Sequence, residues 1–298
     1  MTRPILVTGP QGFAGSNLLA QLGEQGLPTD VDVTDAPALA ETVRSSSPGA
    51  IVHLAAVSSV TASAEDPGAA WRVNVVGAVN LLEAARADAP GARILMVSTG
   101  EVYGRADQVP TPEDAPLAPI SQYAASKAAA EIACGLASRS GLDVVVARAF
   151  QHEGPGRDER FAVGSWTAQI ARAEEAGGGS VLVGDLSSQR DITDVRDVCR
   201  AYELLLDPAV PAQTYNVASG RVVELRDVLD LLVGMARCPI QVEPDPGRSR
   251  RSDLTVISGD PSRLHAATGW APTIPLEQTL ADTLDFARHT AAERMAST

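Results

Sequence analysis

Ile5-Leu6-Val7-Thr8-Gly9-Pro10-Gln11-Gly12-Phe13-Ala14-Gly15 is the stretch, close to the N-terminus, that indicates the fold. Its apolar first four residues are typical of a short buried strand, and a leucine-rich helical pattern follows it. Between the two, Gly9, Gly12 and Gly15 form a G-x-x-G-x-x-G spacing. Glycines also serve ordinary turns, but at this place they let the backbone approach a pyrophosphate at a helix N-terminus. The stretch therefore predicts a dinucleotide-binding turn.

Strand-like and helical segments alternate along the first half of the chain. The expected strands cover residues 5–8, 50–54, 93–97 and 143–147, and the expected helices cover residues 16–25, 69–87 and 122–138. This alternation is typical of βαβ units, and uninterrupted apolar strands are typical of a parallel sheet that is buried on both faces. We therefore expect an α/β fold, a doubly wound parallel sheet of the Rossmann type.

The second half of the chain has a different character. Glycine and proline cluster at residues 154–156 and glycine at 177–179, and a strand and a helix are expected at 214–217 and 223–234. A length of 298 residues also suggests about two domains. We expect a dinucleotide-binding domain over residues 1–149, its sheet completed by parts of 180–225. Residues 150–298 are then mainly a smaller substrate-binding lobe.

The composition excludes several classes of protein. The net charge is −13, which argues against binding to nucleic acid or to anionic membrane surfaces. No apolar run approaches the roughly 20 residues that span a bilayer, and no signal peptide is recognisable at the N-terminus. The three cysteines form no pairing pattern, which favours a cytoplasmic protein. The four histidines are widely spaced, so we expect no metal site.

The segment after the first helix is short for a full second strand and loop. An acidic residue at the end of the second strand normally binds the ribose hydroxyls of the cofactor adenosine. Asp30 or Asp32 has this role if the segment is more than a polar turn, and we name Asp32 as the candidate. No Arg or Lys lies between Arg3 and Arg44 to bind a 2′-phosphate, which favours NAD(H) over NADP(H).

A tyrosine and a lysine stand four residues apart in the helical segment that contains Tyr123 and Lys127. This spacing places both side chains on one face of a helix. A nearby ammonium group lowers the pKa of a phenol, which can then exchange a proton with a carbonyl or an alcohol. Thr99 ends an expected strand upstream and offers a hydroxyl to the same substrate oxygen.

Together these motifs resemble those of the extended short-chain dehydrogenase/reductases, which act on nucleotide sugars. The matching segments lie at residues 8–15, 53–56, 74–77, 98–104 and 123–127. The resemblance implies that Tyr123 is the catalytic acid or base, Lys127 its ribose-binding and pKa-lowering partner, and Thr99 the hydroxyl helper. Asn74 either supports the proton-relay helix or is a structural polar group of its own helix.

The resemblance also implies two sets of binding residues. For NAD(H) or NADP(H) these are Gly9, Gln11, Gly12, Phe13, Gly15, Asp32, Leu54, Ala55, Ala56, Asn74, Tyr123 and Lys127. For a nucleotide-sugar substrate they are Ser59, Gln151, His152, Arg190 and Arg250. Guanidinium groups pair bidentately with phosphate oxygens, so Arg190 and Arg250 are the candidates for the diphosphate. The alternatives are a bridge from Arg190 to Asp194 and a solvated loop at residues 248–251.

The second half resembles one branch of this family, the GDP-4-keto-6-deoxy-mannose reductases. The matching segments are residues 148–156, 190–197, 259–264, 268–270 and 274–280. The branch implies NAD(P)H-dependent reduction of the C4 ketone of a nucleotide-linked 4-keto-6-deoxy sugar, with GDP-4-keto-6-deoxy-mannose as the expected substrate. Gln151 departs from the pattern because the family usually has Asn at this position.

Two other functions compete with the reductase. A 4,6-dehydratase or a 4-epimerase of the same family is the alternative, and Glu101 stands where dehydratases carry a catalytic base, although reductases can also have an acid there. Gly100 takes the place of the Asp general acid of dTDP-glucose dehydratases, which argues against that subgroup. A catalytically silent dinucleotide sensor is disfavoured because such proteins lose Tyr or Lys, whereas Tyr123 and Lys127 are both present.

The helices around Asn74 and Tyr123 are rich in alanine. Proteins of the resembling family often pair through these two helices as a four-helix bundle. We therefore expect a homodimer, with tight packing of the helices against the sheet of the same chain as the alternative.

Overall fold

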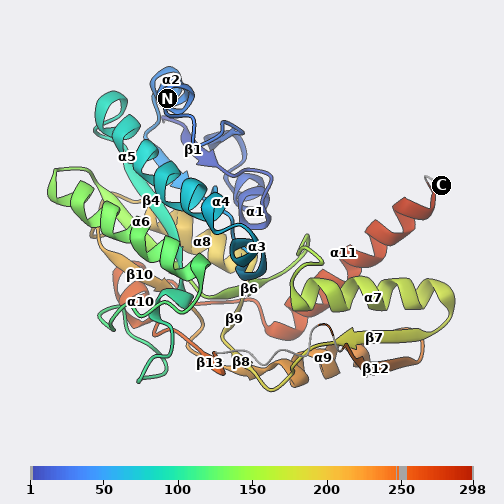
Figure 1. Cartoon of the computed structure of the whole chain (residues 1–298). Coiled ribbons are helices and arrows are strands. Elements are labelled where there is room, and N and C mark those ends of the chain that lie inside the picture. The colour runs from blue at the N-terminus through green and yellow to red at the C-terminus, as the bar shows by residue number, and fades with distance from the viewer. Residues whose placement is uncertain (1–2, 246, 248–253, 297–298) are drawn as a thin grey trace.

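The computed structural model describes residues 3–245, 247 and 254–296, and its centre is a six-stranded sheet (Figure 1). The strand order is β10-β5-β4-β3-β1-β2, and every neighbouring pair is parallel. The strands are β1 (Ile5–Thr8), β2 (Gly26–Thr29), β3 (Ala50–His53), β4 (Arg93–Thr99), β5 (Val144–Ala149) and β10 (Thr214–Val217). The expected doubly wound parallel sheet is confirmed.

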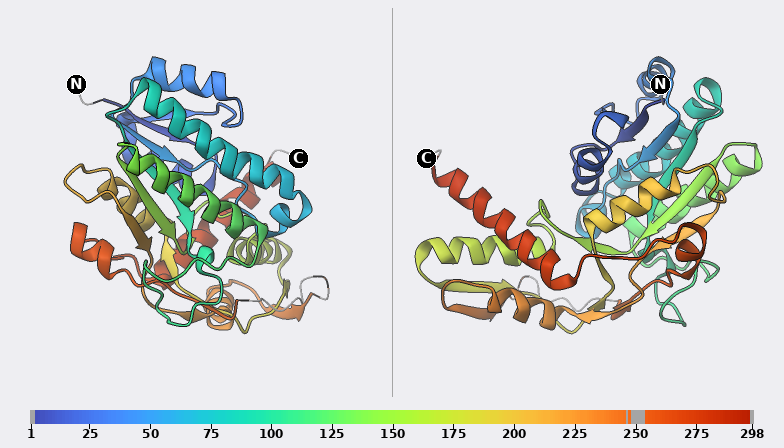
Figure 2. Two further views of the ribbon diagram at one scale, coloured as in Figure 1. Left: turned by 60° about the vertical axis from the view of Figure 1, so that its left-hand side comes forward. Right: turned by 180° about the vertical axis from the view of Figure 1, so that it is seen from behind.

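Helices cover both faces of this sheet (Figure 2). The helices α2 (Ala36–Ser46), α5 (Gly77–Asp88) and α6 (Gln122–Arg139) pack on one face, and α1 (Phe13–Leu22) and α8 (Val195–Leu205) pack on the other. Successive strand residues point to opposite faces. Leu6 and Ile51 accordingly belong to the first core, and their neighbours Val7 and Val52 belong to the second. This explains why the strands read as uninterrupted apolar runs.

The short segment after α1 forms an abbreviated edge of the sheet. In the usual dinucleotide-binding order a third strand lies outside the second, whereas here β2 is itself the edge strand. Pro28 lies within β2, and an edge strand tolerates a proline because its outer side needs no ladder hydrogen bonds. The chain then enters α2 directly, with the Asp35 carboxylate accepting a hydrogen bond from the Ala38 N–H.

The second lobe has a core of its own below the sheet in Figure 1. It is built from α7 (Ala162–Ala176), α9 (Leu225–Gly234), α11 (Leu276–Ala296) and the parallel pair β7 (Gly179–Val183) and β12 (Ile240–Pro244). Two small sheets join the lobes. The first has three strands, β11 (Val223–Glu224), β8 (Gln189–Arg190) and β13 (Val256–Ile257). The second pairs β6 (Gln151–Glu153) with β9 (Ile192–Asp194). The other described helical segments are α3 (Val60–Glu65), α4 (Pro67–Trp71), a π-helical turn (Arg72–Val76), α10 (Ser262–Thr268) and two 3-10 turns (Gly23–Gln25 and Gly100–Tyr103).

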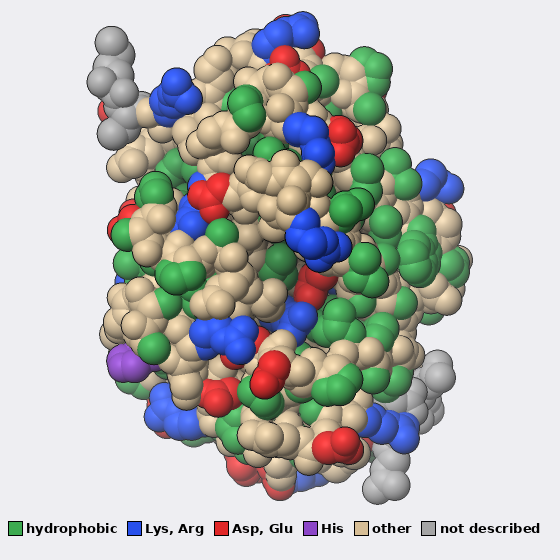
Figure 3. All heavy atoms as spheres, turned by 90° about the vertical axis from the view of Figure 1, so that its left-hand side faces the viewer, with side chains coloured by type: hydrophobic (Ala, Val, Ile, Leu, Met, Phe, Trp, Pro, Cys, Tyr) green, Lys and Arg blue, Asp and Glu red, His purple; other side chains and the backbone are tan. Residues whose placement is uncertain are grey.

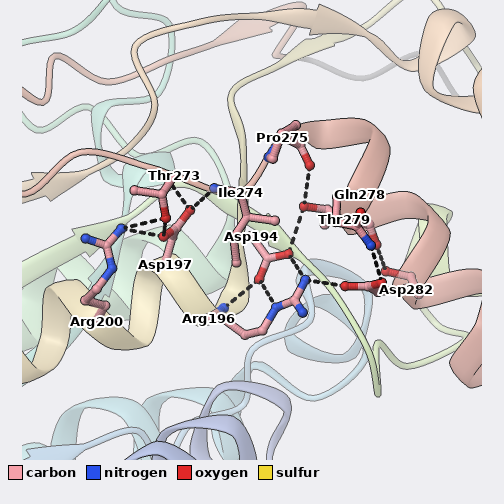
Figure 4. A network of polar contacts seen from close by, with 11 residues as sticks. Asp194, Arg196, Asp197, Arg200, Thr273, Ile274, Pro275, Gln278, Thr279 and Asp282 are labelled. Carbon is pink, nitrogen blue, oxygen red and sulfur yellow. Dashed lines mark hydrogen bonds and ion pairs between the residues drawn. The ribbon is translucent and has the colours of Figure 1, made fainter.

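A network of buried carboxylates fastens α11 and the segment before it to α8 (Figure 4). Asp194 receives a hydrogen bond from the Arg196 backbone N–H and pairs with the Arg196 guanidinium, which also binds Asp282 of α11. Asp197 accepts hydrogen bonds from the backbone N–H groups of Thr273 and Ile274. Because α8 packs on the sheet and α11 belongs to the second lobe, these contacts hold the two lobes together.

Candidate active site

A cleft of about 490 Å³ lies between the lobes, at the carboxyl ends of β1, β3, β4 and β5. This is the edge of a doubly wound sheet where ligands bind, close to the point at which the strand order reverses. Its walls come from the glycine turn, from Thr99, Tyr123 and Lys127, and from Arg190, Leu225 and Ile257 across the junction. The cleft therefore brings together most of the residues that the sequence singled out.

The glycine turn has the shape of a phosphate cradle. Gly9 has φ +69°, and a Cβ there would lie 2.7 Å from the Ala55 nitrogen. A Cβ on Gly15 would overlap the Gly9 carbonyl oxygen. Gly12 precedes α1 and has no side chain to cap the helix N-terminus. Phe13, like the three glycines, lines the cleft. The turn can therefore present backbone N–H groups to an anion, and these residues fit a dinucleotide pyrophosphate.

The segment after β3 is fixed by a buried hydrogen-bond chain. The Thr8 hydroxyl bonds to His53 Nδ1 at 2.9 Å and accepts from the Ala55 N–H at 3.2 Å. Burial, with a smaller effect of the Lys127 charge, lowers the pKa of His53 to about 3, so its ring is neutral. Leu54, Ala55 and Ala56 line the cleft. They can thus form one wall of the predicted cofactor site.

Asn74 lies in the π-helical turn and contacts residues next to the cleft without lining the cleft itself. Its amide exchanges hydrogen bonds with the backbone of Val57 and donates to the Ser126 hydroxyl at 2.9 Å. It therefore ties the segment after β3 to the helix that carries Tyr123 and Lys127. The neighbouring serine prediction needs a correction: Ser58 lines the cleft, whereas the Ser59 hydroxyl accepts a hydrogen bond at the start of α3.

Thr99, Glu101 and Tyr123 form the centre of the cleft. Burial and the nearby Glu101 carboxylate raise the pKa of Tyr123, while a hydrogen bond with the Thr99 side chain and the Arg157 charge act in the opposite direction. Burial likewise raises the pKa of Glu101, against the effect of Arg190. We expected a lowered pKa for Tyr123, and that expectation is wrong because desolvation and the Glu101 charge outweigh the hydrogen bond with Thr99 and the Arg157 charge.

Lys127 lies one helical turn after Tyr123 and is the only lysine of the chain. Its side chain is buried, and Nζ donates a hydrogen bond to the Val97 carbonyl oxygen at 2.8 Å. Burial lowers its pKa to about 8, with Cys134 and Glu131 acting in the opposite direction. The group is therefore still mostly protonated at neutral pH.

A buried polar network under α6 holds the strand ends that carry these groups. The Ser98 hydroxyl donates to Glu131, and Arg148 of β5 forms a bidentate pair with the same carboxylate at 2.7 Å. Arg148 also donates to the Tyr103 hydroxyl at 2.7 Å, and that hydroxyl donates to Asn216 of β10. The network fixes the spacing of β4, β5, β10 and α6 below the cleft. No sequence motif indicates this network because its members are far apart in the chain.

The far wall of the cleft carries Gln151 and His152 on β6. Gln151 Nε2 donates to the buried Glu153 carboxylate at 2.9 Å. His152 Nδ1 bonds to the Phe150 carbonyl oxygen at 2.9 Å, and its ring stacks on Phe13 with centroids 5.8 Å apart. Burial, followed by the Arg157 charge, lowers the pKa of His152 to about 4, so the ring is neutral. Both predicted substrate residues line the cleft.

Arg157 is a cleft residue that the sequence analysis did not identify. Its guanidinium lies over the ring of Phe161 at 3.7 Å and over the ring of Phe13 at 5.0 Å. It also pairs with Glu153 at 3.1 Å. Phe13 belongs to the glycine turn and Phe161 precedes α7, so Arg157 links the two sides of the cleft. The G-P-G sequence before it, which places Arg157 at a turn, was the available signal.

Arg190 is brought into the cleft by β8. Burial lowers its pKa, while Glu101 and Asp185 raise it. The next residue, Asp191, fixes this strand because its carboxylate accepts hydrogen bonds from Ser219, Gly220 and Ser258. The other diphosphate candidate, Arg250, lies outside the described residues.

The choice of Asp32 as the candidate for binding the cofactor ribose also needs a correction. Asp30 follows β2 directly and accepts a hydrogen bond from Gln11 Nε2 of the glycine turn at 3.1 Å. Asp32 instead binds the backbone N–H and the hydroxyl of Thr34, at 2.9 and 2.8 Å. Asp30 is thus the acidic residue at the end of the second strand, while Asp32 stabilises a turn.

The described part of the chain holds no cluster of three or more His, Cys, Asp or Glu side chains that could bind a metal ion. None of the described helices is both long and apolar enough to cross a membrane.

The chain is similar to proteins of known activity. GDP-6-deoxy-D-mannose reductase from Pseudomonas aeruginosa is 35% identical over 94% of this chain and 95% of its own length. The structure of RMD from Pseudomonas aeruginosa complexed with NADPH superimposes with a TM-score of 0.89, at 33% identity, covering 97% of this chain and 100% of that one. UDP-glucose 4-epimerase from Thermus thermophilus complexed with NAD gives a TM-score of 0.83 at 28% identity, covering 96% and 99% of the two chains. The family model of GDP-mannose 4,6 dehydratase matches residues 28–283, and the chain belongs to that family.

Proposed function

We propose that this protein reduces the C4 ketone of a nucleotide-linked 4-keto-6-deoxy sugar, with GDP-4-keto-6-deoxy-mannose as the substrate. The observation that carries the proposal is the meeting of Thr99, Tyr123 and Lys127 with the glycine turn in one cleft. The similarity to the GDP-6-deoxy-D-mannose reductase of Pseudomonas aeruginosa supports this choice of substrate.

The chemistry of the cleft follows from the protonation states of its residues. A bound nicotinamide dinucleotide supplies the hydride. Tyr123, kept protonated by its raised pKa, gives a proton to the ketone oxygen as the charge on that oxygen develops. The Thr99 hydroxyl holds the same oxygen, and the Lys127 ammonium compensates the phenolate that remains. Glu101 lies beside Arg190, which neutralises part of its charge.

The two ends of the cleft suit the two ends of a nucleotide sugar. Arg190 and Arg157 bring positive charge into the cleft of a protein whose net charge is −13. This arrangement favours a diphosphate over other ligands because guanidinium groups bind phosphate oxygens in a fork geometry. Gln151 donates its NH₂ group to Glu153, which leaves its carbonyl oxygen to accept a hydrogen bond from a sugar hydroxyl.

A steady-state assay of NADH and NADPH oxidation with GDP-4-keto-6-deoxy-mannose tests the proposal. The wild-type protein should oxidise one reduced cofactor for each sugar reduced. Tyr123→Phe should lower kcat by at least about 10²-fold, the range for loss of a general acid, and leave cofactor binding intact. No turnover of any 4-keto-6-deoxy sugar nucleotide by the wild-type protein would rule the function out.

A 4,6-dehydratase is the second candidate, because the Glu101 carboxylate lines the cleft and acts on the pKa of Tyr123. Such an enzyme regenerates its cofactor in every cycle. Incubation with GDP-mannose and catalytic NAD(P) would then form a 4-keto-6-deoxy product without net cofactor consumption, and Glu101→Gln would abolish that product. A reductase leaves GDP-mannose unchanged in the same incubation.

We further propose that NAD(H) is the preferred cofactor. Asp30 stands at the end of β2 beside the glycine turn, where its charge repels a 2′-phosphate. No Arg or Lys occurs between Arg3 and Arg44. The similar structure from Pseudomonas aeruginosa contains NADPH, so the preference needs its own test. The ratio of kcat/KM for NADH to that for NADPH should exceed one and should fall in Asp30→Ser; a ratio below one contradicts the preference.

We also propose a homodimer formed through the π-helical turn, α5 and α6. Hydrophobic side chains gather on the right-hand side of the surface in Figure 3, where these helices lie. On α6, Ile132 and Leu136 are 69% and 60% exposed, and Val76 and Val79 are exposed beside them. Apolar patches of this kind mark protein interfaces. Ile132→Glu should convert the dimer to a monomer in sedimentation equilibrium, whereas Val242→Glu on β12 should not.

A further inference from the structure

Tyr202 of α8 is a buried tyrosine whose hydroxyl has no hydrogen-bond partner among the residues that the structure describes. Its side chain is 0% exposed to solvent, yet it lines the cleft between the lobes. The other three tyrosines of the chain are all engaged. Tyr103 donates to Asn216, Tyr215 donates to the Pro211 carbonyl oxygen, and Tyr123 bonds with Thr99.

An unpartnered hydroxyl at such a place is unfavourable for the ligand-free protein. Buried polar groups nearly always have a partner, and each one left without a partner carries a desolvation penalty. A buried hydroxyl on a residue that lines a binding cleft recovers this penalty when a bound ligand supplies the missing partner. Burial, together with Cys199 and Tyr123, raises the pKa of Tyr202 well above its ordinary value. The group therefore stays protonated and has a proton to donate.

The position of Tyr202 shows which part of a ligand it reaches. Its side chain packs in the same core as Val97, Ala149 and Phe13, on the side of the sheet that is covered by α1 and α8. It is also close enough to Tyr123 for the two hydroxyl groups to interact electrostatically. The reacting half of a dinucleotide must come to Tyr123, whereas Arg190 and Leu225 line the cleft from β8 and α9.

We propose that the Tyr202 hydroxyl donates a hydrogen bond to an acceptor oxygen of the nicotinamide-ribose half of the bound dinucleotide. This proposal rests on the proposed use of a nicotinamide cofactor. Tyr202 is then a binding residue that raises the affinity for the cofactor. Its contact lies in the nicotinamide-ribose half, whereas the glycine turn contacts the pyrophosphate.

Calorimetric titration of the full chain with NADH tests this assignment through Tyr202→Phe, which removes only the hydroxyl. Loss of one neutral hydrogen bond should raise the Kd for NADH by about three- to tenfold. The Kd for 5′-AMP, which lacks the nicotinamide half, should stay within about twofold of the wild-type value. The melting temperature of ligand-free Tyr202→Phe should equal or exceed that of the wild type, because no partner is lost.

Tyr215→Phe is the matched control, because this tyrosine is equally buried in the same core but its hydroxyl is hydrogen-bonded away from the cleft. It should lower the melting temperature and leave the Kd for NADH unchanged. An unchanged Kd for NADH in Tyr202→Phe overturns the assignment, as does an equal loss of affinity for NADH and 5′-AMP. If the wild-type protein binds neither NADH nor NADPH, the proposed function fails together with the Tyr202 assignment. If the wild-type protein binds NADH and Tyr202→Phe binds it equally well, only the Tyr202 assignment fails.

Discussion

Replacing Lys127 by methionine should make the protein more stable while it abolishes turnover. Methionine keeps the length and the apolar body of the side chain and removes the buried charge. The lowering of the Lys127 pKa from 10.5 to about 8 means that folding disfavours the charged form by about 3 kcal/mol, at 1.36 kcal/mol for each pKa unit. Loss of the hydrogen bond to the Val97 carbonyl oxygen costs about 1 kcal/mol. The net gain at neutral pH is then about 2 kcal/mol.

The sign of this effect can be tested through its pH dependence. Because the pKa of Lys127 is lower in the folded than in the unfolded protein, the unfolded state binds more protons between about pH 8 and 10.5. The wild-type protein therefore recovers stability from this group as the pH rises through that window. The advantage of Lys127→Met is largest below about pH 8, and at about pH 9.5 it has lost about 2 kcal/mol.

Urea denaturation of both proteins at the two pH values measures this difference, and groups that titrate equally in both proteins cancel. A direct readout is also possible because the chain has a single lysine. With lysine labelled by ¹³C at the ε-carbon, the folded protein gives one signal, whose titration midpoint should lie near 8. A midpoint near the ordinary value, or an advantage of Lys127→Met that grows with pH, would refute the reasoning.

Three further outcomes are expected. Gly15→Ala should abolish NADH binding in calorimetry and lower the free energy of unfolding by about 1–3 kcal/mol, because the new methyl group overlaps the Gly9 carbonyl oxygen. Arg148→Met should cost about 3–5 kcal/mol in urea denaturation because it removes the guanidinium that pairs with the buried Glu131 carboxylate, and adding Glu131→Leu should restore most of that loss. In steady-state assays kcat/KM should fall above about pH 8, as Lys127 loses its proton.

The sheet and its helices were predictable because their signals are local. A four-residue apolar run, a glycine triplet and a leucine-rich pattern lie side by side, and they predict the order of β1, the turn and α1 and the position of β1. The spacing of Tyr123 and Lys127 likewise depends only on the helix that carries both. Helix α1 begins at Phe13, three residues before the predicted start. The prediction began too late because glycine and phenylalanine have no strong helix propensity, whereas in the structure the helix starts directly after the glycine turn.

The contacts that tune the site were not predictable, because they join residues from distant parts of the chain. Arg157 meets Phe13 across the junction of the lobes, and Glu131 meets Ser98 and Arg148 between α6 and two strands. The choice between Asp30 and Asp32 depends on where β2 ends, and element ends are the least certain feature of a sequence pattern. The pKa of Tyr123 moves against expectation for the same reason, since burial is a property of the whole fold.

Burial also separates the pKa values of Lys127 and Tyr123, the two residues of the proposed proton transfer. In water the lysine ammonium and the phenol lose their protons at nearly the same pH, with ordinary values of 10.5 and 10.0. In the cleft the pKa of Lys127 falls to about 8 while that of Tyr123 rises. In the proposed reaction the Lys127 ammonium first compensates the phenolate that Tyr123 leaves, and because Lys127 is then the more acidic of the two groups, the later passage of a proton from it to the phenolate, directly or through water, is downhill. In the proposed reaction, the desolvation that costs the protein stability at Lys127 therefore favours the return of a proton to Tyr123, and Lys127 must then regain a proton from water before the next turnover.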